Sequence, residues 1–225
     1  MLGLQHACAA PQTDLRSYHP GMMFPWQDSR QAFRDAAAYF VQTASVAEGR
    51  WDAPGLGEWD VRALVGHTSR SLLTVEAYLA QPAAAVEVDS TAGYFRATSG
   101  AAVDSGVAQR GREAGLALGA DPARALANLA ERVLTLIDGC DGTELLTTFA
   151  GGMRLSDYLP TRTFELAVHT ADLAVALDRP VDLPATAATQ ALHLVTELAV
   201  ARGLAGPLLL AATGRPRLPR VFSVL

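Results

Sequence analysis

Glu165 and His169 are the residues best placed to do chemistry in this chain, because they stand four apart in a largely apolar stretch. The stretch runs from Arg162 to Leu177 and reads RTFELAVHTADLAVAL. In a helix, residues four apart lie on the same face, one turn from each other. A carboxylate above an imidazole on an apolar helix is half of a candidate metal site.

His67 offers a third ligand from another apolar segment, much earlier in the chain. Two histidines and one carboxylate, with a position left open for water or substrate, form a known catalytic arrangement for a divalent metal. The alternative is that His67 and His169 are core histidines. Each would then be hydrogen-bonded to a neighbouring backbone group or carboxylate, since an unpaired buried imidazole is unfavourable.

Two charged residues beside this motif have roles that the sequence leaves open. Asp172 lies three residues after His169 and could orient a ligating imidazole, or it could form a salt bridge on the helix surface. Arg162 lies three residues before Glu165 and could pair with that carboxylate or bind an anionic substrate. Both residues are therefore candidates for a part in the chemistry around the ligands.

The remaining histidines are weaker candidates. His6 and His19 fall in residues 1–27, a segment with three prolines and no periodicity, which we expect to be a flexible tail. His193 lies four residues before Glu197 but has no third polar partner that the pattern places nearby. A role on the surface or in helix packing is therefore favoured for His193.

The helix that carries both motif residues is expected to be amphipathic and to begin after Pro160, because proline is tolerated only near a helix start. Val168 and Val175 widen its apolar stripe. Residues 178–180, which end in a proline, are expected to stop it. Residues 147–159 before it are expected to form a connection, with a turn at two successive glycines.

The other helices are predicted from apolar periodicity and from start signals. Asp60 is a good N-cap for the helix that carries His67. Residues 81–88 are expected to form a loop or an extended link, and residues 91–118 have weak helical character and are interpreted as one or two irregular helices. The remaining predicted helices run from Asp28 or Ser29 to Ala47, from Val61 to Ala80, from Pro122 to Ile137, from Pro184 to Arg202 and from Pro207 to Thr213.

This pattern of helices predicts an all-α protein. Helices separated by one long connection are typical of a four-helix bundle with a crossover, here with extra C-terminal helices. Half of the residues are apolar, mostly Ala, Leu and Val, and only 7% are aromatic, which also favours close-packed helices. We expect a single domain over residues 28–225.

Composition excludes several classes of function. The net charge is −5, and the 18 basic residues, all arginine, form no patch, so no nucleic-acid partner is expected. No uncharged apolar run reaches the ~18 residues that a membrane span needs, and no secretory signal is recognised, so no membrane partner is expected. Cys8 and Cys140 are far apart and in no metal-binding pattern, which favours the reducing cytoplasm.

The two motif segments together resemble a known family. Residues 57–70, GEWDVRALVGHTSR, resemble the signature W-(S/T/D)-V-R-D-L-V-x-H of the mycothiol-dependent maleylpyruvate isomerase family, part of the DinB-like group of four-helix metalloproteins. Residues 162–177 resemble its second signature, R-x-x-E-x-x-x-H-x-x-D-L-A-x-A. The closing LLLAATGRPRLP resembles the end of many short actinobacterial members.

The resemblance covers about residues 29 to 220. The sequence departs from the family pattern at Ala171, where many members have Trp. It also includes no counterpart of the second, α+β domain that contributes to the active site of the characterised isomerases. The resemblance therefore supports metal binding more directly than it supports isomerisation of maleylpyruvate.

This resemblance implies a DinB-like fold in which His67, Glu165 and His169 bind a divalent metal, usually Zn²⁺, with Ni²⁺ or Fe²⁺ as alternatives. It also implies mycothiol as the thiol cofactor of a transferase or isomerase that acts on a small electrophilic substrate. The sequence leaves open whether the protein is a monomer or a homodimer. Two rival hypotheses remain. One is a metal hydrolase with the same ligands, and the other is a non-catalytic helical bundle that serves dimerisation or another interaction.

Overall fold

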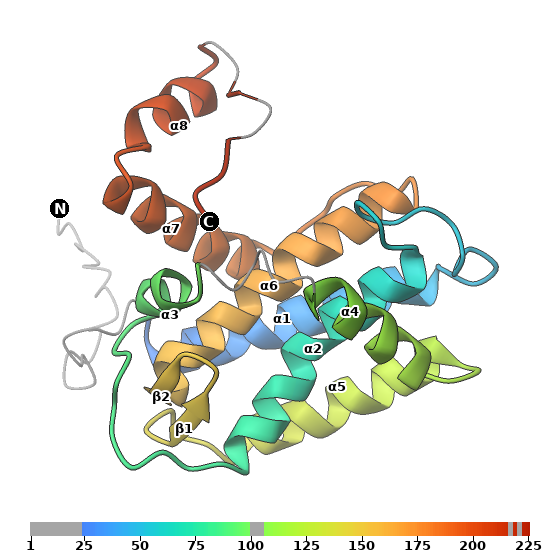
Figure 1. Ribbon diagram of the computed structural model, residues 1–225, viewed down its shortest axis with the longest axis horizontal. Helices are drawn as coiled ribbons and strands as arrows, with labels where there is room; N and C mark the ends of the chain where they lie inside the picture. Colours follow the sequence, from blue (N-terminus) through green and yellow to red (C-terminus); the bar gives the residue numbers. More distant parts are fainter. Residues whose placement is uncertain (1–23, 100–105, 216–217, 220–221) are drawn as a thin grey trace, which may run out of the picture.

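The computed structural model describes residues 24–99, 106–215, 218–219 and 222–225. In these residues the chain forms eight helices and a single two-stranded hairpin, which confirms the all-α prediction (Figure 1). The helices are α1 (Trp26–Ser45), α2 (Val61–Leu79), α3 (Thr91–Thr98), α4 (Gly106–Ala117), α5 (Pro122–Asp138), α6 (Leu155–Ala176), α7 (Ala185–Ala201) and α8 (Ala205–Ala212). None of the helices described here is long and apolar enough to cross a membrane.

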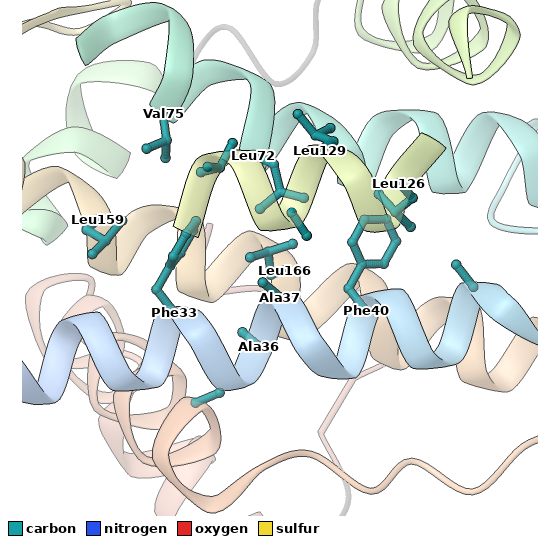
Figure 2. Packing of buried hydrophobic residues seen from close by; sticks show 14 of the residues in the cluster. Phe33, Ala36, Ala37, Phe40, Leu72, Val75, Leu126, Leu129, Leu159 and Leu166 are labelled. Atoms are coloured by element: carbon teal, nitrogen blue, oxygen red, sulfur yellow. The ribbon is translucent and has the colours of Figure 1, made fainter. Parts of the chain in front are cut away.

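Four long helices, α1, α2, α5 and α6, enclose the main core. Both α1 and α2 pack against α5 and against α6, which is the arrangement of a four-helix bundle. Figure 2 shows Phe33 and Phe40 of α1 in this core, with Leu72 of α2, Leu126 of α5 and Leu166 of α6. All five side chains are fully buried, and each contributes about 1.5–3 kcal/mol through the hydrophobic effect.

The long connection between α2 and α5 contains α3 and α4, as the weak helical pattern of residues 91–118 predicted. Ser90 caps α3 by accepting a hydrogen bond from the backbone N–H of Gly93. The helix α4 packs against α2, whereas α3 packs against α6 and α7 (Figure 1). The connection therefore covers two of the bundle helices instead of running free of them.

The helix that carries Glu165 and His169 begins earlier than predicted. Strands β1 (Leu145–Thr148) and β2 (Gly151–Arg154) form an antiparallel hairpin, and α6 follows directly from Leu155. Pro160 therefore lies inside α6, and the prediction of a connection over residues 147–159 is wrong. Backbone hydrogen bonds with residues 81 and 83 also hold β1, and no short-range pattern reveals such a non-local pairing.

The first half of α6 is buried all round, so the expectation of an amphipathic helix is wrong there. Leu166 belongs to the main core, whereas Phe164 and Ala167 belong to a second cluster that includes residues of α7. Val168 and Val175 do not widen a buried stripe, because they are 36% and 66% exposed. A helix packed between two clusters loses the one-sided pattern that marks a surface helix.

The predicted starts of two other helices also shift. The helix α1 begins at Trp26, so Trp26 and Gln27 belong to it and not to the expected tail, whereas residues 1–23 lie outside the described residues. The helix α7 follows Pro184 as predicted, but α8 begins at Ala205, two residues before Pro207. Proline is tolerated in the first turn of a helix, which explains this difference.

Candidate metal centre

Two bundle helices bring the candidate ligands together. The side chain of Asp60 accepts a hydrogen bond from the backbone N–H of Ala63 and so caps α2, as predicted. His67 lies two turns further along α2, which packs against α6. Glu165 and His169 are successive-turn neighbours on α6, as their spacing predicted. The structure therefore places one residue of α2 against two of α6.

The ligand atoms of His67, Glu165 and His169 all lie within 4.8 Å of one another. The Nε2 atom of His169 is 3.2 Å from Nε2 of His67 and 3.2 Å from Oε2 of Glu165. Ligands held at the usual zinc distances in a tetrahedral site are about 3.3 Å apart, so these separations suit a small divalent cation. All three residues are half-buried.

The protons of this cluster also fit a cation. His169 Nδ1 lies 3.1 Å from Asp172 Oδ2, so the proton on that nitrogen donates to the carboxylate. If His169 is neutral, its Nε2 then carries a lone pair that faces Nε2 of His67 and the ionised Glu165. If His169 is protonated, its single Nε2–H group faces both acceptors, His67 and Glu165. A divalent cation would satisfy all three donor atoms at once, and no group among the described residues does so.

The pKa values of the two imidazoles diverge. Burial, together with the neighbouring His169, lowers the pKa of His67 to about 4. Burial would also lower the pKa of His169, but hydrogen bonds to Asp172 and Glu165 outweigh it and raise the pKa to about 9. Burial would raise the pKa of Glu165, but the hydrogen bond with His169 and the charge of Arg162 lower it. Neutral His67 and ionised Glu165 are the forms that bind metal, whereas His169, which is protonated at neutral pH without an ion, would release its Nε2 proton on binding one.

Arg162 is 8% exposed, and its guanidinium lies over the rings of Tyr94 and Tyr158, 5.1 Å from each centroid. Its Nε donates a hydrogen bond to Thr161 Oγ1 at 2.9 Å. Within the described residues, no carboxylate comes within ion-pair distance of Arg162, so the ion pair with Glu165 that the sequence suggested is not formed. The site thus contains a buried positive charge held by aromatic rings.

Sequence reasoning missed the aromatic neighbours of the site. The indole of Trp59 stacks on the ring of His67, with centroids 4.5 Å apart and planes 30° apart. Tyr94 and Tyr158 flank Arg162 from α3 and α6. Trp59 falls inside the first signature segment, which was the only signal for it. The tyrosines carry no comparable signal, because they come from separate elements whose packing the sequence pattern does not show.

His193 lies apart from this cluster, as its pattern suggested. It is exposed on α7, and its ring contacts Phe24 edge to face with centroids 5.3 Å apart. The only group of His, Cys, Asp and Glu side chains in the described residues with metal-binding geometry is His67, Glu165 and His169.

A comparison with models of protein families matches residues 30–174 to the mycothiol maleylpyruvate isomerase N-terminal domain. This interval spans most of α1 and continues into the last turn of α6, so it includes all four bundle helices and the three candidate ligands. Comparisons with curated proteins and with solved structures found no match.

Proposed function

This chain belongs to the family of the mycothiol maleylpyruvate isomerase N-terminal domain, and on that premise we propose that it is a metal-dependent enzyme that uses mycothiol. Its substrate would be a small electrophile, and its compartment the cytoplasm. His67, Glu165 and His169 would hold a divalent ion, with zinc first and nickel or iron as alternatives. The convergence of these three donor atoms from α2 and α6 is the observation that carries the proposal.

A divalent ion at this position would lower the pKa of a thiol that it coordinates and so favour the nucleophilic thiolate at neutral pH. Three protein ligands leave a tetrahedral ion one open position, which is typical of catalytic sites and not of structural ones. Glu165 would act as a ligand and not as a base, because its carboxylate oxygen faces the imidazoles.

The roles of the surrounding residues follow from their contacts. Asp172 would keep the proton of His169 on Nδ1 and so leave Nε2 free to bind the ion. Glu165 and Asp172 supply two negative charges and Arg162 one positive charge, so a divalent ion leaves one net positive charge. A site of this charge favours an anionic ligand such as a thiolate over a neutral one.

The products and the thiol dependence of turnover would distinguish an S-transferase, an isomerase and a metal hydrolase. A product that retains the sulfur would identify an S-transferase. A geometric isomer of the substrate, formed with recovery of the thiol, would identify an isomerase. Turnover that does not depend on thiol would identify the rival metal hydrolase, in which water takes the open position.

Elemental analysis of the purified protein tests the proposal, with the variants His67→Ala and His193→Ala beside the native chain. We expect about one zinc, nickel or iron per chain in the native protein and in His193→Ala, and loss of the metal in His67→Ala. His193 is the matched control, because it is also a helical histidine but lies outside the cluster.

The metal-loaded protein would then be screened with mycothiol and a panel of conjugated alkenes and alkyl halides. Consumption of an electrophile that requires both the metal and the thiol would support the proposal. A native protein that takes up no metal, even after reconstitution, would contradict it and leave His67 and His169 as core residues.

A further inference from the structure

The two imidazoles of the candidate centre are held in different ways. Asp172 hydrogen-bonds Nδ1 of His169, which is the usual way in which proteins orient a ligating histidine. Nδ1 of His67 is buried and has no hydrogen-bond partner among the described residues. No hydrogen bond at Nδ1 therefore orients the His67 ring, and on that side its orientation depends on packing.

Trp59 supplies that packing. Its indole covers the ring of His67 at a centroid distance of 4.5 Å and an angle of 30°, which is a stacked arrangement. Its Nε1 donates a hydrogen bond of 3.1 Å to the carbonyl oxygen of Ala108 in the first turn of α4. The indole is thus fixed at one end by α4 and contacts the ligand with its face.

The helix α4 can hold Trp59 in this place because glycines let it approach α2 closely. A Cβ atom added to Gly66 of α2 would lie 2.1 Å from the backbone nitrogen of Gly115 in α4. A Cβ atom on Gly111 would lie 3.1 Å from Cε2 of Trp59. An ion pair of 2.6 Å between Arg112 of α4 and Glu58, the residue before Trp59, adds a second link.

We infer that Trp59 is a positioning residue for the metal ligand His67, with α4 as its support. The inference rests on the proposed function, since it assumes that His67 binds metal. Stacking restricts the rotation of the imidazole as a hydrogen bond on Nδ1 would, so Nε2 stays directed at His169 and Glu165. Removal of the stacking partner weakens metal binding without removing a ligand.

The test uses Trp59→Leu, Trp59→Phe and the matched control Trp51→Leu. Trp51 is also a half-buried indole, but it packs beneath Arg62 and not against a ligand. Zinc affinity would be measured by competition with a chelator, and the ligand geometry by the visible absorption spectrum of the cobalt-loaded proteins. Circular dichroism of the metal-free proteins would check that each variant folds.

Trp59→Leu should bind zinc about 10- to 100-fold more weakly, the range seen when a group that orients a ligand is removed, and its cobalt spectrum should change. Trp59→Phe keeps a ring over His67 and should recover most of the affinity. Trp51→Leu should match the native protein in both measurements. Zinc affinity within about twofold of native in Trp59→Leu, with an unchanged cobalt spectrum, would overturn the inference.

Gly111→Ala provides a second route if Trp59→Leu does not fold. The added methyl group would lie 3.1 Å from the edge of the indole, so the ring would have to shift by a few tenths of an ångström while it remains over His67. We expect weaker zinc binding, and native affinity would overturn the inference. A native chain that binds no metal would instead overturn the proposed function together with this inference, so the two failures are distinguishable.

Discussion

At the residue scale, the candidate centre depends on how three donor atoms share protons. Nε2 of His169 faces both Nε2 of His67 and Oε2 of Glu165 at 3.2 Å. Asp172 accepts a hydrogen bond from the Nδ1–H group on the opposite side of the ring and so influences whether Nε2 carries a proton. Asp172 is therefore expected to influence how tightly His169 would bind a metal ion.

Asp172→Asn should weaken zinc binding about 10- to 100-fold while leaving the fold intact, because the asparagine cannot stabilise His169 as a carboxylate does. Competition with a chelator measures the affinity. Asp182→Asn is the control, since Asp182 is an exposed aspartate away from the cluster. If Asp172 only formed a surface salt bridge, its removal would leave zinc affinity at the level of the control.

Cys140 gives a prediction about pH. Burial, with the nearby acidic groups Glu144 and Asp141, raises the pKa of the Cys140 thiol to about 11. The thiolate is the reactive form, so alkylation of Cys140 should accelerate as the pH rises towards about 11. At neutral pH it should be about tenfold slower than alkylation of an unperturbed thiol, because lower thiolate content outweighs higher intrinsic nucleophilicity.

Alkylation by iodoacetamide, followed at the Cys140 peptide by mass spectrometry, would measure this rate. The same peptide in urea-unfolded protein is the control and should react as an ordinary thiol. Fast alkylation of Cys140 in the folded protein at pH 7 would contradict the raised pKa of this thiol. Cys140 could then compete with mycothiol for the electrophilic substrate.

At the scale of elements, α6 carries two candidate ligands and also packs between two hydrophobic clusters. Its C-terminal end is also fixed, because Arg50 donates hydrogen bonds to the carbonyl oxygens of Ala176 and Leu177. A cation at a helix C-terminus stabilises it through the helix dipole as well. The helix therefore presents Glu165 and His169 from a rigid support.

Leu166→Ala and Val175→Ala test this arrangement of α6. Leu166 is fully buried in the main core, so its truncation should lower the free energy of unfolding by about 2–5 kcal/mol. Val175 is 66% exposed, and its truncation should change stability by less than about 0.5 kcal/mol. Urea unfolding of both variants measures the difference. Equal losses of stability in the two variants would instead support the amphipathic helix predicted from the sequence, in which Val175 lies in the buried stripe.

At the scale of the whole molecule, the proposed metal binding would be coupled to folding. The proposed ligands lie far apart in the chain, with His67 and His169 separated by 102 positions, so only the folded bundle assembles the site. A metal that binds the folded chain and not the unfolded chain stabilises the protein by mass action. The stability of the bundle should therefore report on occupancy of the centre.

Removal of the metal should lower the melting temperature by about 5–10 °C, given a stabilisation of about 2.7 kcal/mol at a hundredfold excess over the dissociation constant. Thermal melts with zinc and with a chelator measure the shift. His67→Ala should melt at the same temperature in both conditions. A native protein that is indifferent to zinc would show that the folded chain has no specific site.

The local features of this protein could be predicted from its sequence alone. The spacing of Glu165 and His169 places them one turn apart on any helix, Asp60 caps α2, and the two signature segments led to the family that residues 30–174 confirm. The all-α class also follows from composition and helical periodicity, which are local properties of the chain. That the three residues bind metal stays a prediction, which metal analysis would test.

The tertiary structure shows what depends on contacts between distant segments. Pro160 lies inside α6 because the β1–β2 hairpin, which is hydrogen-bonded to residues 81 and 83, leads directly into the helix. The tertiary structure also buried α6 on two sides, set Trp59 against His67 through α4, and left Arg162 between two tyrosines with no ion-pair partner among the described residues. Periodicity reports one buried face of one element, whereas these features are set by which elements pack together.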